Sequence, residues 1–216
     1  MRMDEMIRSF PRQINDQWNA LKSLEFDLGR FNGVENIVIA GMGGSAISGD
    51  ITKILTKNEL SVPITVVRDY SIPRWTDEQT LFILSSYSGN TEETLSCFKA
   101  AILKSKKIIS ISTGGELESL SLENDVKVVG LPPGYQPRAA LGFSLITLLT
   151  VLCKINLIKS DFLDIVIRAS HTLDDFYDEY CAENLLADSI AKKIKDGVIA
   201  IYGVESSTDH IASRFR

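Results

Sequence analysis

Short apolar segments alternate with helical segments along most of this chain. An apolar run of four residues is typical of a buried strand, and regular strand–helix alternation favours a parallel sheet with helices on both faces. The sequence therefore predicts an α/β fold: a three-layer, doubly wound, five-stranded parallel sheet preceded by N-terminal helices. The five predicted strands are Ile37–Ala40, Ile64–Val67, Leu81–Leu84, Ile108–Ile111 and Val126–Val129.

Two polar loops follow predicted strands. Gly41-Met42-Gly43-Gly44-Ser45 comes directly after the strand that ends at Ala40. Ser86-Tyr87-Ser88-Gly89-Asn90-Thr91 comes shortly after the strand that ends at Leu84. Ligands of open α/β sheets bind outside the carboxyl ends of the strands. Both loops therefore lie where a ligand is expected.

The second loop has the chemistry of a phosphate site. It offers the hydroxyls of Ser86, Ser88 and Thr91 at the start of a predicted helix, where free N–H groups and the positive dipole end favour an anion. It contains no lysine or arginine, which favours a cradle of hydroxyls and amides. An alternative is that Asn90 only caps the helix, with Glu93 closing a capping box. The two interpretations are compatible.

The first loop has three glycines in four positions, which lets the backbone approach a ligand closely. Gly41, Gly43 and Ala46 also fit the dinucleotide fingerprint G-x-G-x-x-A. That fingerprint expects an acidic residue about 20 positions later, and the best candidate, Asp69, comes late in the sequence. A nicotinamide cofactor would also leave the second loop without a role.

Together with Pro137-Arg138-Ala139-Ala140, the two loops resemble the sugar isomerase (SIS) family of phosphosugar-binding domains. Their order and spacing are most similar to its branch of bifunctional phosphoglucose/phosphomannose isomerases, and the resemblance runs from about Phe26 to Arg216. It implies a flavodoxin-like sheet. It also implies an isomerase that interconverts glucose 6-phosphate or mannose 6-phosphate with fructose 6-phosphate through an enediol, without a metal or cofactor.

The same resemblance assigns roles to particular residues. Arg138 is the expected catalytic residue, because a fixed positive charge suits an enediolate; the alternative is a salt bridge or a role at the start of a helix. Tyr87 is expected to pack rather than to touch the ligand. The expected substrate-binding residues are Ser86, Ser88 and Thr91 for the phosphate and Gly43, Gly44 and Ser45 for the sugar.

A segment near Arg216 has a sequence similar to that of the first predicted strand and the start of the glycine-rich loop. Ile199-Ala200-Ile201-Tyr202-Gly203 repeats the pattern of Ile37–Gly41, which indicates an internal duplication. In the family, the catalytic base, the ring-opening histidine and a lysine follow the second copy of the loop. This chain is therefore expected to hold mainly the binding half and to show little or no turnover. The expected divisions are an N-terminal helical segment (1–30), a first SIS domain (31–156), a helical connector (157–195) and the beginning of a second SIS domain (196–216).

A second class of function stays open, namely a sugar-phosphate-binding regulatory module without turnover. Composition excludes other classes. The net charge of −5 with no basic cluster argues against nucleic acid and anionic membranes as partners.

Three widely spaced cysteines indicate neither a disulfide framework nor a metal cluster, and they favour the reducing cytoplasm. The apolar helix predicted over Ala139–Cys153 is too short to cross a bilayer. We expect it to be buried between two domains or two subunits, which suggests a homodimer.

Overall fold

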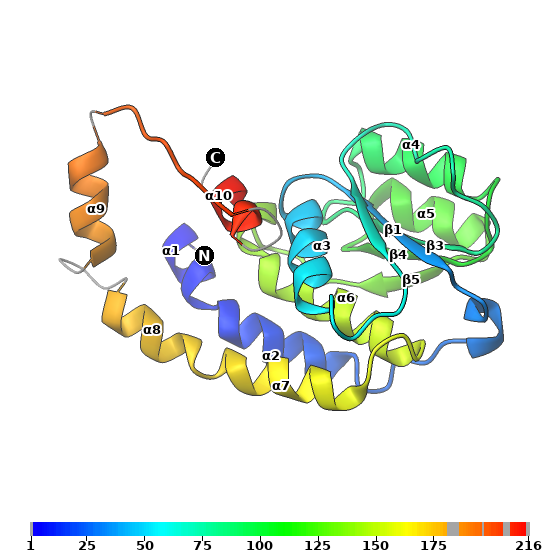
Figure 1. Cartoon of the computed structure of the whole chain (residues 1–216), viewed down its shortest axis with the longest axis horizontal. Coiled ribbons are helices and arrows are strands. Elements are labelled where there is room, and N and C mark those ends of the chain that lie inside the picture. Colours follow the sequence, from blue (N-terminus) through cyan, green and yellow to red (C-terminus); the bar gives the residue numbers. More distant parts are fainter. Residues whose placement is uncertain (1, 181–185, 196, 205–207, 215–216) are drawn as a thin grey trace.

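A five-stranded parallel sheet forms the centre of the protein (Figure 1). The computed structural model describes residues 2–180, 186–195, 197–204 and 208–214. The strand order is β2-β1-β3-β4-β5, with neighbouring strands parallel throughout. The strands are β1 (Asn36–Gly41), β2 (Ile64–Val67), β3 (Thr80–Ser85), β4 (Ile108–Ser112) and β5 (Lys127–Gly130).

All five predicted strands are present, and the α/β prediction is confirmed. The central strand β3 is buried along its whole length, as expected for a strand covered on both faces. The edge strand β5 lies one residue later than predicted, at Lys127–Gly130, and two of its four residues are exposed. A half-covered edge strand has a weaker apolar pattern, which explains why its boundary was harder to place.

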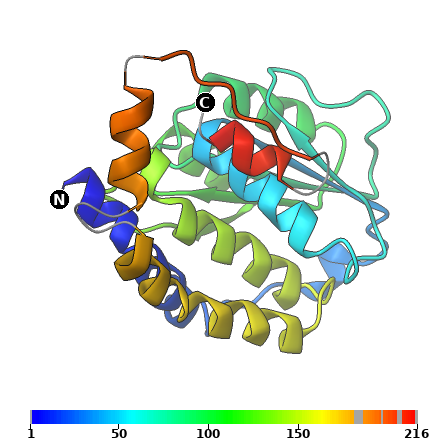
Figure 2. The ribbon, with the colours of Figure 1, turned by 60° about the vertical axis from the view of Figure 1, so that its left-hand side comes forward.

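Helices cover both faces of the sheet (Figures 1 and 2). On one face, α4 (Glu92–Ala101) and α5 (Gly115–Glu123) enclose a core that contains Phe82 and Phe98. The other face packs against α3 (Gly43–Leu55) and α6 (Leu141–Lys154).

The helix α6 is buried almost all round, as its apolar sequence predicted. Eleven of its 14 residues are buried, which places it in the interior of the protein. Its neighbours, however, are α2 (Phe10–Ala20), α3 and α7 (Ser160–Ser170) of the same chain, rather than a second domain or a second subunit. Its burial therefore gives no argument for a dimer. Among the residues that the structure describes, no helix is long and apolar enough to span a membrane.

The remaining helices lie outside this core. The expected N-terminal helical segment is α1 (Met3–Arg8), α2 and a short 3-10 turn, η1 (Leu28–Phe31). The expected helical connector (157–195) contains α7, α8 (Leu173–Tyr180) and α9 (Leu186–Ile194), with residues 181–185 outside the described part of the chain. Figure 2 shows α7 beside α2 and then α8 and α9 leading away from the sheet.

The predicted strand at Ile199–Gly203 does not form. These residues have no regular structure, and the neighbouring Val198 and Val204 are exposed, as is Tyr202. A strand needs a partner for its backbone groups, and no described strand lies beside this segment. The short helix α10 (Asp209–Arg214) follows and lies against α3 (Figure 2).

The core makes one prediction about cysteine chemistry. Burial, helped by nearby Asp69 and Glu93, raises the pKa of the Cys97 thiol to about 11, and its Sγ donates to the Asp69 carbonyl at 3.2 Å. Because the thiolate is the reactive form, we expect iodoacetamide at pH 8 to leave Cys97 unlabelled in the folded protein. Peptide mass spectrometry measures this, with the half-buried Cys153 as the internal comparison. Labelling of Cys97 in the folded protein as fast as in denaturing urea would contradict the prediction.

Candidate functional site

The two polar loops meet at the carboxyl ends of neighbouring strands. Gly41, the last residue of β1, pairs in register with Ser85, the last residue of β3. The chain runs from β1 outward to β2 on one side and from β3 to β4 and β5 on the other. This is the point where the strand order reverses, and in doubly wound sheets of order 2-1-3-4-5 it is where ligands bind. The dinucleotide-binding order, 3-2-1-4-5-6, is a different one.

The hydroxyl loop, Ser86–Thr91, presents its polar groups at the start of α4. Ser86 is buried and its Oγ lies 2.8 Å from Thr91 Oγ1, while Ser88 is exposed and accepts from the Asn90 N–H at 3.2 Å. Thr91 occupies the N-cap position of α4, and its side chain makes no hydrogen bond to the first N–H groups of this helix. Those donors therefore remain available to an anion.

The prediction that Asn90 caps α4 is wrong. Asn90 Oδ1 instead accepts from the Glu116 N–H at 2.9 Å, in the first turn of the neighbouring helix α5. The expected capping box with Glu93 is also absent, because α4 begins one residue later and its N-cap is Thr91. Asn90 thus fixes the hydroxyl loop to α5 and leaves the N-terminus of α4 uncapped.

Backbone packing fixes the shape of the hydroxyl loop as well. Gly89 has a φ of +70°, and a Cβ at this position would lie only 1.7 Å from the Gly114 carbonyl oxygen. Its own carbonyl accepts from the Leu117 N–H at 2.8 Å. The loop is therefore held against the start of α5 at a contact that only glycine allows.

The glycine loop, Gly41–Ser45, begins α3. Gly43 has a φ of +48° and lies in the first position of the helix, and Ser45 is buried. A Cβ on Gly44 would lie 2.7 Å from the Pro137 carbonyl oxygen. This close approach brings the glycine loop against the turn η2 (Pro137–Ala139), which carries the exposed Arg138.

Tyr87 connects the hydroxyl loop to the segment that leads to Arg138. Its hydroxyl donates to the Pro132 carbonyl at 2.7 Å and accepts from the Tyr135 N–H at 3.0 Å. Burial raises the pKa of this phenol, which keeps it in the neutral form that can donate. The prediction of a packing residue fits this geometry, but sequence reasoning missed the bridge. Nothing in the local pattern distinguishes a bridging tyrosine from one that only fills space.

The three predicted elements therefore lie together. The hydroxyl loop and the glycine loop follow adjacent strands, and the Arg138 turn contacts the glycine loop and is tied to the hydroxyl loop through Tyr87. Their side chains offer hydroxyls and one guanidinium group. Among the described residues, no group of His, Cys, Asp or Glu side chains is arranged to hold a metal ion.

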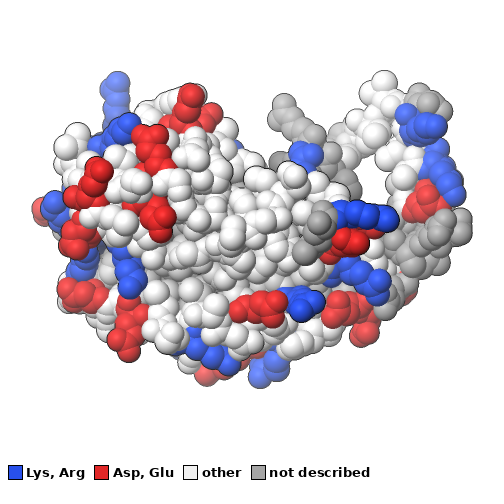
Figure 3. Space-filling view, turned by 180° about the vertical axis from the view of Figure 1, so that it is seen from behind, with Lys and Arg blue, Asp and Glu red and all other residues white. Residues whose placement is uncertain are grey.

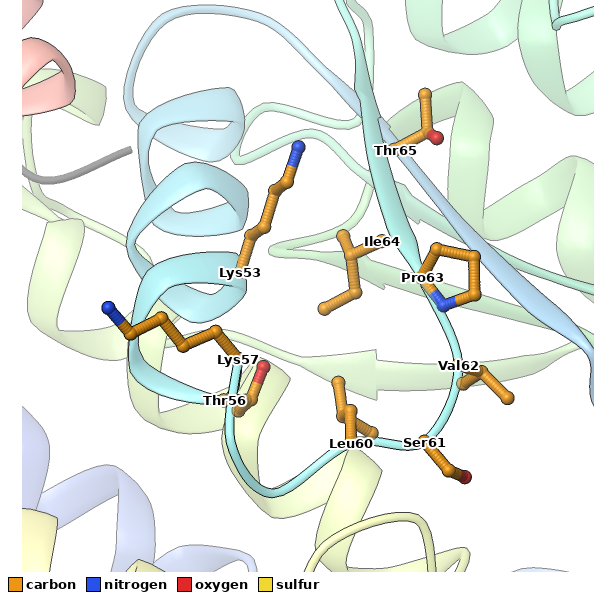
Figure 4. Close-up of a pocket in the computed structure, with 9 residues that line it drawn as sticks. All are labelled: Lys53, Thr56, Lys57, Leu60, Ser61, Val62, Pro63, Ile64 and Thr65. Carbon is orange, nitrogen blue, oxygen red and sulfur yellow. The ribbon is translucent and has the colours of Figure 1, made fainter. Parts of the chain in front are cut away.

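A separate groove lies at the opposite edge of the sheet (Figure 4). It has a volume of about 610 Å³ and lies between the C-terminal end of α3 and the amino end of β2. Lys53 and Lys57 line it, whereas no residue of the three site elements does. Its two lysines make this groove the alternative location for an anion.

The surface charges show no dominant basic patch on the face seen in Figure 3. Blue and red side chains alternate around the margin of that face, with a broad uncharged area between them. This distribution agrees with the small net negative charge of the chain.

The fold and the site together define a doubly wound α/β domain with polar loops at its switch point. No family model matches the chain. The bifunctional phosphoglucose/phosphomannose isomerase of Caldicellulosiruptor bescii is 36% identical over 217 residues, which cover 99% of this chain and 64% of that protein. The D-glucosamine-6-phosphate 4-epimerase of Sulfolobus acidocaldarius is 31% identical over 84% of this chain and 55% of its own length.

Solved structures agree on the fold. The C-terminal domain of the glucosamine-fructose-6-phosphate aminotransferase from Francisella tularensis superposes with a TM-score of 0.69 at 17% identity, over 90% of this chain and 59% of that one. The chain belongs to the sugar isomerase (SIS) family, and within it is related to the bifunctional phosphoglucose/phosphomannose isomerases. It spans just under two thirds of the length of the Caldicellulosiruptor bescii relative.

Proposed function

We propose that this chain is the sugar-phosphate-binding half of an aldose–ketose isomerase that interconverts glucose 6-phosphate or mannose 6-phosphate with fructose 6-phosphate. The observation that carries the proposal is the convergence of the hydroxyl loop, the glycine loop and the Arg138 turn at the β1–β3 switch point. The relationship to the bifunctional isomerases supports the choice of substrates.

In this proposal the hydroxyl loop binds the phosphate. The hydroxyls of Ser86, Ser88 and Thr91 donate hydrogen bonds to phosphate oxygens, and the uncapped N–H groups of α4 add further donors. The glycine loop, through Gly43, Gly44 and Ser45, lies along the sugar, where the lack of side chains allows close approach.

The reaction moves one proton between C1 and C2 and passes through an enediolate. Arg138 supplies the positive charge that stabilises this intermediate. A base beside the two carbons and an acid that opens the ring are also required. We propose that residues following a second copy of the glycine loop provide them. The apolar Ile199–Gly203 segment, which echoes β1 and is largely exposed, supports a beginning of a second SIS domain over 196–216.

The proposal extends to organisation and location. Residues 1–30 form an N-terminal helical segment, 31–156 the first SIS domain and 157–195 a helical connector. Exposed apolar residues on α8 and α9, such as Phe176 and Ile190, support a partner on this connector, and we propose a homodimer. The cytoplasm is the proposed location, because hexose phosphates are metabolites of that compartment and the cysteines suit a reducing one.

The competing function is a sugar-phosphate-binding module without turnover. It shares the phosphate site, so binding alone does not separate the two. A coupled assay of a protein containing both SIS domains separates the two functions, because only an isomerase forms fructose 6-phosphate from glucose 6-phosphate.

The binding step is tested by thermal unfolding. A ligand that binds only the folded state raises the melting temperature. We expect fructose 6-phosphate at millimolar concentration to raise the melting temperature of this chain and NAD at the same concentration to leave it unchanged. A shift with NAD and none with fructose 6-phosphate would reverse the assignment and favour a dinucleotide site.

A further inference from the structure

Gln13 is a buried amide beside the turn that carries Arg138. It comes from α2 and is only 1% exposed. Its Nε2 donates to the carbonyl oxygens of Ala139, at 2.8 Å, and Met6, at 3.0 Å, and lies 3.1 Å from Ser9 Oγ. Its Oε1 accepts from the Gly142 N–H at 3.1 Å. One side chain therefore bonds the residue that follows Arg138 and the first turn of α6.

The approach of Gln13 to this segment is as close as packing allows. A Cβ on Gly142 would lie 2.9 Å from both Cβ and Oε1 of Gln13 and 2.9 Å from the Phe10 carbonyl oxygen. On its other side the turn meets Gly44, through the contact with the Pro137 carbonyl oxygen. The Arg138 turn is thus held between the N-terminal helices and the glycine loop.

We propose that Gln13 is a positioning residue for Arg138. This proposal rests on the proposed function, in which Arg138 stabilises the enediolate. Gln13 touches no substrate in this arrangement. It fixes the backbone at Ala139, and with it the direction from which the Arg138 guanidinium reaches the sugar carbons.

Loss of the buried Gln13 amide is expected to move the Arg138 turn for an energetic reason. Buried carbonyl and N–H groups that lose a partner are costly, so the backbone at Ala139 and Gly142 would shift to find another donor and acceptor if Gln13 were apolar. A shift of about 1 Å is enough to misplace a catalytic group. The segment 1–30 would then act on the site without contributing a ligand-binding side chain.

Gln17 provides a matched control. It lies one turn further along α2, is 2% exposed, and donates to the Gly130 carbonyl at 2.9 Å and to Thr147 Oγ1 at 3.0 Å. Gln13→Met and Gln17→Met therefore remove the same buried amide from the same helix. Only the first loses a bond to the Arg138 turn.

The test compares two ligands by calorimetry on this chain. Fructose 6-phosphate reports ground-state binding, and 5-phosphoarabinonohydroxamic acid mimics the planar, anionic enediolate that Arg138 would bind. We expect Arg138→Met to weaken hydroxamate binding about tenfold or more, on the scale of hydrogen bonds to charged groups, and fructose 6-phosphate binding far less.

Gln13→Met should then reproduce that selective loss, and the double variant should lose little more. Gln17→Met should leave the ratio of the two affinities unchanged. If Gln13→Met does not fold, Gln13→Asn is measured instead: its shorter side chain keeps a buried amide but withdraws it from Ala139 and Gly142.

The positioning role would be overturned if the Gln13 and Gln17 variants had the same ratio of hydroxamate to fructose 6-phosphate affinity. It would also be overturned if the losses of hydroxamate affinity in Gln13→Met and Arg138→Met were fully additive. Either result would leave the proposed function intact. Wild-type protein that binds neither ligand would instead refute the proposed function, and the positioning role with it. The two failures are therefore distinguishable.

Discussion

Replacing Gly89 with alanine is expected to abolish binding of fructose 6-phosphate. The new Cβ would lie 1.7 Å from the Gly114 carbonyl oxygen, a distance that no side-chain movement can relieve because both atoms belong to the backbone or are fixed to it. The hydroxyl loop would have to separate from α5 and lose the bonds from the Leu117 N–H and from Glu116. Isothermal titration calorimetry measures the loss directly.

Gly33→Ala is the control for this prediction. Gly33 has a similar φ of +67°, but no atom lies within 4 Å of the position of its Cβ. The Gly33→Ala substitution should therefore lower the free energy of unfolding only by the backbone strain, on the order of 1 kcal/mol. The variant should bind fructose 6-phosphate as the wild type does. Comparable binding by Gly89→Ala and wild-type protein would show that the loop geometry does not determine affinity.

Removing a single hydroxyl from the loop is the second large expected effect. Ser88→Ala and Thr91→Ala should each weaken fructose 6-phosphate binding by about 0.5–3 kcal/mol, the range for hydrogen bonds to neutral and charged partners. Thr91→Ala also leaves Ser86 Oγ without its 2.8 Å partner. Because the hydroxyls bind one phosphate, the double variant is not expected to equal the sum of the two.

Ser61→Ala controls for this pair of variants. Ser61 is an exposed serine in the groove at the opposite edge of the sheet (Figure 4). Its loss should leave the affinity unchanged. A loss of affinity in Ser61→Ala, with none in Ser88→Ala and Thr91→Ala, would move the phosphate to the groove.

The sheet was predictable from sequence because its three central strands, β1, β3 and β4, are almost completely buried. Continuous apolar runs such as Leu81–Leu84 are typical of strands covered on both faces, and most of the runs are followed by a helical pattern. The strand order was not predictable by this means. It depends on which helix crosses which face, and local periodicity carries no information about that.

The site was predictable in part. Glycines and hydroxyls at strand ends mark a loop, so the hydroxyl and glycine loops were found from their residues, and family resemblance added Arg138. The connections between them were not found. Asn90 bonds a helix that begins 25 residues later, and Gln13 bonds a segment more than 100 residues away. The available signal for the Gln13 contact was a pair of glutamines, Gln13 and Gln17, one turn apart on the apolar face of α2.

The segment after α9 shows where a local pattern is insufficient. Ile199–Gly203 has the composition of β1 but not its structure. In β1 the backbone groups bond to β2 and β3 on both sides, whereas the described part of the chain offers Ile199–Gly203 no such neighbour. The same residue types therefore form a strand only where the fold supplies partners.

A crystal structure of this chain with fructose 6-phosphate tests most directly whether hydroxyls at a helix start bind the sugar's phosphate. The account predicts phosphate oxygens within about 3 Å of Ser86, Ser88 and Thr91, with the sugar directed toward the glycine loop and Arg138. Phosphate density beside Lys53 and Lys57 instead, with the hydroxyl loop unoccupied, would contradict it.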